Sequence, residues 1–135
     1  MNVLRALIFD CDGVLADTER DGHLPAFNAT FVRYGTPIHW TESAYAEKLR
    51  IGGGKERLAA ELTPDALRGL GISGESARRA FIAELHAAKT RAFTEIVARG
   101  ALPARPGVVR IARELHERGV QLAIASTSAE GSVRA

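Results

Sequence analysis

The sequence predicts an α/β protein in which a parallel sheet is interrupted by a long helical insertion. Three observations support this fold class. An apolar run at residues 3–9 leads directly into Asp10 and Asp12, a second apolar run at residues 120–125 follows an amphipathic helix, and the chain between them shows helical spacing. Short continuous apolar runs are typical of parallel strands that are covered on both faces. We therefore expect the two runs to be buried strands and neighbours in one sheet.

The elements follow in order along the chain. After the strand at residues 3–9, the helical insert spans residues 17–100. It is flanked by the turn from Gly13 to Asp17 and by the Pro- and Gly-rich segment 100–107, both candidate hinges. Pro25 predicts a kink or a late helix start, because it lacks a backbone donor and clashes with the preceding turn. The insert carries three apolar series at helical spacing: Phe27 and Phe31; Leu58, Leu62 and Leu67; Phe81, Leu85, Ala88, Ala92 and Ile96.

The last two elements return the chain to the sheet. Residues 108–118 are amphipathic and predict a helix that Gly119 ends. The apolar run from Val120 to Ala125 then predicts the second strand.

Composition is that of an ordinary globular chain, with 46% hydrophobic and 25% charged residues. The 18 Lys and Arg against 16 Asp and Glu form no basic stripe, so we expect no nucleic-acid partner. The first apolar run is short and contains Arg5, which argues against a membrane span or signal peptide. A single cysteine, Cys11, permits no internal disulfide and fits a reducing compartment. The expected location is cytoplasmic.

Asp10 and Asp12 are the strongest candidates for chemistry. Residues two apart in a strand point to the same side, and Gly13 lets the backbone turn sharply beside them. A polar turn without function is the simpler alternative. A calcium loop is excluded, because Val14 and Leu15 occupy positions where that motif needs Asp or Asn and then Gly.

Five stretches carry a resemblance to a known family: FDCDGVLADTE, GHLPAFNATF, GGGKERLA, RPGVVRIARELHERG and LAIASTS. They resemble the phosphatase and phosphomutase branch of the haloacid dehalogenase superfamily. The resemblance extends to its sugar-bisphosphate phosphatases linked to the Calvin cycle, which dephosphorylate xylulose-1,5-bisphosphate. It implies a haloacid dehalogenase-like, Rossmann-type parallel sheet core from residues 1–16 and 101–135, with a helical cap at residues 17–100. The family is usually well over 200 residues long, so this core is expected to be incomplete at residue 135.

The resemblance implies a hydrolase that removes phosphate from a small sugar phosphate. Asp10 would be the nucleophile that forms an aspartyl-phosphate, and Asp12 the general acid and base. Two carboxylates facing an anionic phosphate require a hard cation, and Mg²⁺ suits carboxylate, carbonyl and water ligands. By resemblance, Asp10 binds Mg²⁺ through its side chain and Asp12 through its backbone carbonyl.

Ser126 matches a family position whose hydroxyl binds the transferred phosphoryl group, and Thr127 beside it is a further candidate for binding phosphate. The alternative is structural, since Thr127 and Glu130 have the spacing of a helix capping box. Glu19 and His23 match family positions near the substrate or hinge. Each is otherwise an ordinary first-turn acid or solvated histidine.

The loop containing Gly53, Gly54 and Lys55 is a candidate substrate loop. It is not a nucleotide-binding P-loop, because Glu56 stands where that motif needs Ser or Thr. By resemblance, its glycines and Lys55 contact the substrate; the alternative is a glycine-rich turn before a charged helix face. His39, His86 and His116 have no spaced partners and are interpreted as structural or surface residues.

The family completes its site with a Lys and further acidic residues that have no counterpart up to residue 135. Two alternatives to a phosphatase therefore remain open: a sugar phosphomutase of the same branch, and a non-catalytic fragment or interaction module. The expected partner is a sugar phosphate, with neither nucleic acid nor membrane, and the complete protein is expected to be a monomer.

Overall fold

The computed structural model describes residues 4–126 and residue 133. Its contacts divide the chain into two compact units. We call Met1–Gly22 together with Thr94–Ala135 the sheet unit, and His23–Phe93 the helical unit. The helical unit is thus a few residues shorter at each end than the insert of residues 17–100 that the sequence predicts. The assignment of the two units as core and cap stays a prediction.

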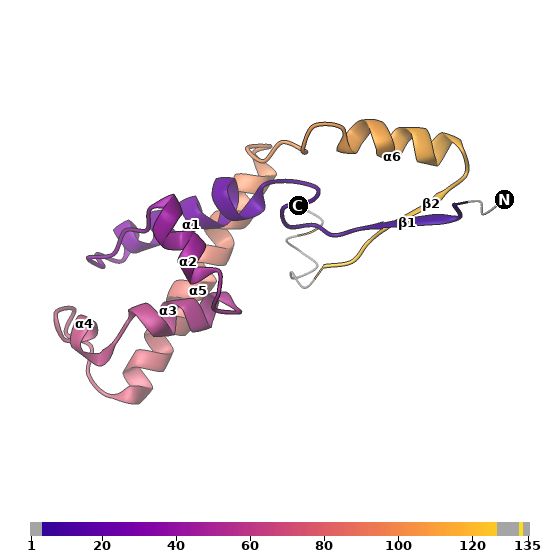
Figure 1. The fold of residues 1–135 in the computed structure, drawn as a ribbon. Helices are drawn as coiled ribbons and strands as arrows, with labels where there is room; N and C mark the ends of the chain where they lie inside the picture. The colour runs from indigo at the N-terminus through magenta and orange to yellow at the C-terminus, as the bar shows by residue number, and fades with distance from the viewer. Residues whose placement is uncertain (1–3, 127–132, 134–135) are drawn as a thin grey trace. The chain divides into compact units, whose positions relative to one another are not determined.

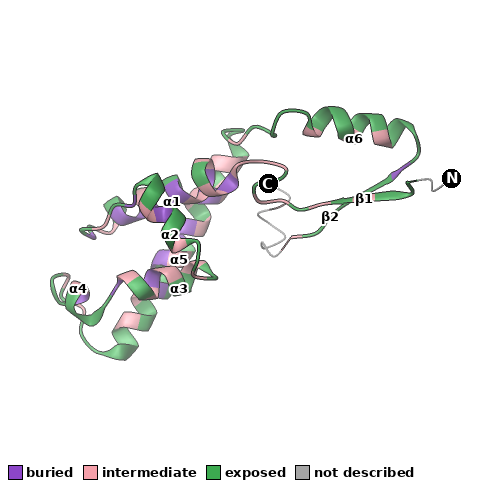
Figure 2. Ribbon diagram, in the orientation of Figure 1, coloured by how far each residue is buried: buried purple, intermediate pink, exposed green. Residues whose placement is uncertain are grey.

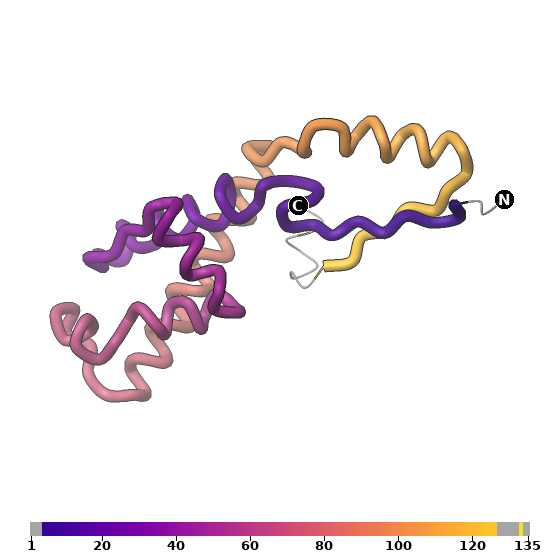
Figure 3. Tube along the Cα trace, viewed as in Figure 1, coloured from indigo at the N-terminus to yellow at the C-terminus, as the bar shows by residue number. Residues whose placement is uncertain are grey.

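The sheet unit contains two parallel strands, β1 (Ala6–Phe9) and β2 (Gln121–Ile124), which lie side by side (Figures 1 and 3). Their register pairs Phe9 with Ile124. The helix α6 (Val108–Glu117) precedes β2, and Gly119, at φ 74°, takes the left-handed conformation that ends the helix. The predicted helix-to-strand return and the parallel pairing are confirmed.

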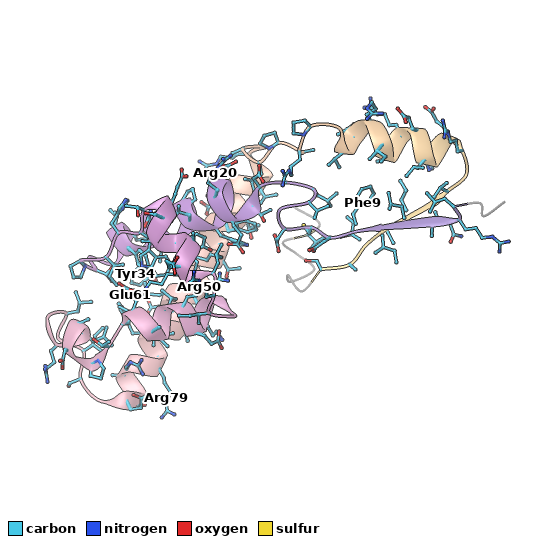
Figure 4. All side chains as sticks on the ribbon, in the orientation of Figure 1. Phe9, Arg20, Tyr34, Arg50, Glu61 and Arg79 are labelled. Carbon is cyan, nitrogen blue, oxygen red and sulfur yellow. The ribbon has the colours of Figure 1, made fainter. Side chains whose placement is uncertain are left out.

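The prediction that both strands are buried is wrong. Residues of β1 alternate between exposed and half-buried, and all four residues of β2 are exposed (Figure 2). Ile8 is 64% and Ile124 is 50% exposed. The reason is that, among the described residues of this unit, α6 is the one helix packed against the strand pair. Phe9 lies on the side of β1 that faces α6 (Figure 4), at an apolar cavity of about 570 Å³.

The helical elements after β1 begin with one turn of π-helix and continue with five α-helices. Pro25 lies in the first turn of α1, which begins only at Leu24, so the late helix start is confirmed. Thr41 and Thr63 cap α2 and α4 by accepting backbone hydrogen bonds from Ala44 and Ala66. The bounds are η1 (Glu19–His23), α1 (Leu24–Arg33), α2 (Glu42–Lys48), α3 (Gly54–Glu61), α4 (Pro64–Arg68) and α5 (Glu75–Ala98).

The helical unit has its own hydrophobic core, visible as the buried residues on the inward faces of its helices (Figure 2). Rings of Phe27 and Phe31 each lie 4.9 Å from the Trp40 ring, measured between centroids. The Arg78 guanidinium fastens α5 to the end of α3, donating to the carbonyls of Ala59 at 2.7 Å and Leu62 at 2.8 Å. The core cluster comprises Leu24, Phe27, Phe31, Trp40, Tyr45, Leu58, Leu62, Leu67, Ile82 and Leu85.

Candidate active site

The carboxyl ends of β1 and β2 bring Asp10 and Ser126 to the same edge of the sheet. Asp10 directly follows Phe9, and the amide of Ala125 donates to the Phe9 carbonyl at 2.8 Å. Ser126 comes next, and it is half-buried. Carboxyl ends of parallel strands are where open α/β sheets bind ligands. Thr127 lies outside the described residues.

The loop after Asp10 is closed by its own backbone hydrogen bonds. The amide of Leu15 donates to the Cys11 carbonyl at 2.9 Å, and the amide of Gly13 donates to the Ala16 carbonyl at 2.8 Å. Gly13 has φ 75°, a conformation that favours glycine. Asp10 accepts the Cys11 amide at 2.7 Å through its Oδ1. We call residues 11–18 the aspartate loop.

Asp12 is held by a threonine that the sequence analysis did not single out. The Thr18 hydroxyl donates to Oδ1 of Asp12 at 2.6 Å, and Thr18 is only 5% exposed.

Cys11 lies between the two aspartates in the sequence. The pKa of its thiol is raised by partial burial and then by the charges of Asp12 and Asp10. The thiol therefore stays protonated at neutral pH and adds no third negative charge.

His23 lies in the helical unit beside a buried lysine. Its Nδ1 is 2.8 Å from Nζ of Lys89, and its ring stacks on Phe93 with centroids 4.0 Å apart. Lys89 is 8% exposed, and its ammonium lies 4.7 Å from the centre of the Phe27 ring. Because Lys89 can only donate, the geometry requires Nδ1 of His23 to accept. Glu19 is the first residue of η1 and belongs to the sheet unit, whereas His23, the last residue of η1, belongs to the helical unit.

The candidate substrate loop forms the start of α3. Gly53 is its N-cap, with φ 88°, and the Glu56 carboxylate folds back against it. A Cβ at Gly54 would lie 2.9 Å from Nε2 of His86, so glycine permits this close approach. Lys55 is exposed. The predicted loop residues thus belong to the helical unit, together with His23.

His86 shares this region of the helical unit with two lysines. Its pKa is lowered by burial, then by the positive charges of Lys89 and Lys55, while Glu56 acts in the opposite direction. Like charges disfavour protonation of the imidazole. The neutral ring is therefore the favoured form at physiological pH.

The donors near Asp10 suit magnesium in kind, since carboxylate and carbonyl oxygens are its preferred protein ligands. Within the described part of the chain, however, no group of three or more His, Cys, Asp or Glu gathers to hold a metal ion. A Mg²⁺ ion at Asp10 and Asp12 would therefore need ligands beyond these two residues. No helix within residues 4–126 is long and apolar enough to cross a membrane.

The chain belongs to the haloacid dehalogenase-like hydrolase family, whose family model matches residues 4–135. Among curated proteins it is 42% identical over 135 residues to the plasmid-borne protein CbbY of Cupriavidus necator, covering 98% of this chain and 50% of that protein. It is 43% identical over 130 residues to a CbbY-like protein of Arabidopsis thaliana, covering 96% of this chain and 41% of the relative. The chain thus spans about half the length of these relatives.

Solved structures give the same family relationship. CbbY from Rhodobacter sphaeroides in complex with phosphate matches with a TM-score of 0.74 at 34% identity, covering 97% of this chain and 54% of that one. A variant of the same protein in complex with xylulose-(1,5)bisphosphate matches with a TM-score of 0.73 at 34% identity and the same coverage. These matches establish the haloacid dehalogenase-like fold with its Rossmann-type core, of which this chain represents part.

Proposed function

We propose that the whole protein is a Mg²⁺-dependent phosphatase of sugar bisphosphates, with xylulose-1,5-bisphosphate as the favoured substrate. The observation that carries the proposal is the position of Asp10 and Asp12 directly after β1, at the same sheet edge as Ser126 after β2. Its support is the similarity to CbbY, a protein that has been crystallised with that bisphosphate. The cytoplasmic location and monomeric state expected from the sequence belong to the same proposal.

The proposed reaction has two steps that share one proton carrier. A carboxylate oxygen of Asp10 attacks phosphorus, the bond from phosphorus to the sugar oxygen breaks, and Asp12 gives its proton to that oxygen. Water then attacks the phosphorus of the aspartyl-phosphate and passes a proton to Asp12. The bond from phosphorus to the Asp10 oxygen breaks, so inorganic phosphate is released and the Asp10 carboxylate is restored. The Thr18 hydroxyl, 2.6 Å from Asp12, holds this proton carrier in place.

Other residues would bind rather than react. Asp10 and the Asp12 carbonyl would hold Mg²⁺, which neutralises phosphate charge when bound. Ser126 would donate a hydrogen bond from its hydroxyl to the transferred phosphoryl group, and Thr127 would bind the phosphate beside it. Residues proposed to contact the rest of the substrate are Glu19, His23, Gly53, Gly54 and Lys55.

Substitution of the proposed nucleophile tests the function. In the protein at its natural length, Asp10→Asn is expected to lower phosphate release from xylulose-1,5-bisphosphate by about 10⁴-fold or more, since nucleophile removal has costs of this order. Asp65→Asn is the matched control, because Asp65 is an exposed residue of α4 with a 2.5 Å ion pair to Arg68. Retained turnover in Asp10→Asn, or full loss in both variants, would contradict the assignment.

A phosphomutase is the second candidate, because it uses the same first step. The archaeal β-phosphoglucomutase from Pyrococcus matches with a TM-score of 0.74 at 23% identity, which supports the shared fold alone. Product analysis separates the two: a phosphatase releases inorganic phosphate, and a mutase returns an isomerised sugar phosphate. Absence of turnover by these 135 residues on sugar phosphates with Mg²⁺ present would support the third candidate, a non-catalytic chain.

A further inference from the structure

Arg105, in the segment before α6, reaches across to the aspartate loop. Its guanidinium Nη1 donates a short hydrogen bond to the Gly13 carbonyl and lies 3.3 Å from Oδ1 of Asp17. Its backbone amide donates to the Leu15 carbonyl at 2.8 Å. Arg105 thus contacts every second residue from Gly13 to Asp17, in a loop that lies about 90 residues earlier in the chain. All of these residues belong to the sheet unit.

Two of the three residues that Arg105 contacts are the chain neighbours of Asp12 and Thr18. Gly13 follows Asp12, and Asp17 precedes Thr18. Asp12 and Thr18 are themselves joined by the 2.6 Å hydrogen bond. Arg105 therefore holds the backbone next to Asp12 through the Gly13 carbonyl, and it contacts the side chain of the residue next to Thr18 through Asp17.

We propose that Arg105 is a positioning residue for Asp12, acting through the backbone of the aspartate loop. This inference rests on the proposed function, in which Asp12 must reach first the leaving oxygen and then the attacking water. Small misplacements of a reacting group cost large factors in rate. An arginine suits the task because its planar guanidinium can bind a carbonyl and a carboxylate together.

The backbone contact, more than the ion pair, is expected to matter. Side chains of Arg105 and Asp17 are 47% and 42% exposed, and exposed ion pairs contribute little. Asp17 also lies 4.0 Å from Arg20, which can compensate for a lost partner. No other side chain among the described residues donates to the Gly13 carbonyl. Removing Arg105 should therefore have a larger effect than neutralising Asp17.

The test compares Arg105→Ala, Arg105→Lys and Asp17→Asn in the protein at its natural length. Arg110→Ala is the matched control, because Arg110 pairs at 2.8 Å with Glu114 on the exposed face of α6. Two readouts are needed. Amide hydrogen exchange of a peptide covering residues 11–18 reports on the loop, and kcat, KM and the pH profile of kcat report on Asp12.

Arg105→Ala is expected to speed exchange at the Gly13 and Leu15 amides and to lower kcat about 10-fold, with KM changed less than about 2-fold. Arg105→Lys should recover part of kcat, because its ammonium can still donate to the Gly13 carbonyl. Asp17→Asn and Arg110→Ala should stay close to the unsubstituted protein.

Two results would overturn the inference in distinguishable ways. If Arg105→Ala matches Arg110→Ala in exchange and in kcat while the unsubstituted protein is an active phosphatase, Arg105 positions nothing and the proposed function stands. If the unsubstituted protein releases no phosphate from any sugar phosphate, the proposed function fails and the catalytic role of Arg105 fails with it.

Discussion

Replacing Thr18 with valine removes one hydrogen bond while nearly keeping the shape of the side chain. Thr18 is 5% exposed, and its hydroxyl lies 2.6 Å from a carboxylate oxygen of Asp12. Hydrogen bonds to charged groups contribute about 1.5–3 kcal/mol. Because Asp12 is only half-buried, water can replace part of the bond, so we expect a loss of about 1.5–2 kcal/mol in the free energy of unfolding. If the reaction barrier rises by the same amount, kcat falls about 10- to 30-fold.

Urea unfolding and steady-state kinetics of the natural-length protein measure both effects. Thr18→Ser is the matched control, because serine keeps the hydroxyl and loses only a methyl group. A Thr18→Val variant with the same kcat as Thr18→Ser would refute the reasoning that the hydroxyl orients Asp12. A change in KM alone would refute it as well, since Asp12 is proposed to act in the reaction steps rather than in substrate binding.

Two further predictions concern the helical unit. Leu85 is fully buried in its core, so Leu85→Ala should lower the free energy of unfolding by about 3–5 kcal/mol, whereas Val32→Ala, at a site that is 77% exposed, should change it by less than about 0.5 kcal/mol. Equal urea midpoints for the two variants would contradict the assigned core. Because burial, Lys89 and Lys55 hold the pKa of His86 down, the unfolded chain binds the proton first as pH falls. Stability should therefore decrease below about pH 6.5, the ordinary histidine value. His86→Gln should reduce the difference between the urea midpoints at pH 7.5 and 5.5, and an undiminished difference would contradict this cause.

Elements with strong local signals were predictable from the sequence. The helix α6 and the strand β2 are separated by Gly119, whose positive φ of 74° is one that glycine adopts readily. Parallel pairing of β1 with β2 followed from the crossover between them, and it places Asp10 and Ser126 at one edge. The positions of these two candidate residues could therefore be inferred before any contact was known.

Elements with weak local signals were not predictable. The seven residues of α2 bury one side chain, Tyr45, so no periodic pattern marks this helix. The π-turn η1 departs from the 3.6-residue repeat on which the helix prediction relied. Thr18 and Arg105 could not be identified from the sequence for a different reason. Their roles depend on hydrogen bonds to Asp12 and Gly13, and neither residue type at its position indicates such a partner in advance.

An apolar pattern can predict a strand correctly even where the described residues do not bury that strand. The apolar residues of β1 and β2 correctly indicated parallel strands, yet Ile8 and Ile124 are at least half exposed. Within the described residues, α6 covers one side, where Phe9 and Leu122 line the cavity of about 570 Å³. An apolar face gains stability only when another layer removes it from water. The relatives that this chain matches are about twice as long, which supplies room for such a layer in those proteins. The apolar pattern of the two strands therefore indicates a sheet covered on both faces, whereas the described residues cover one face of it.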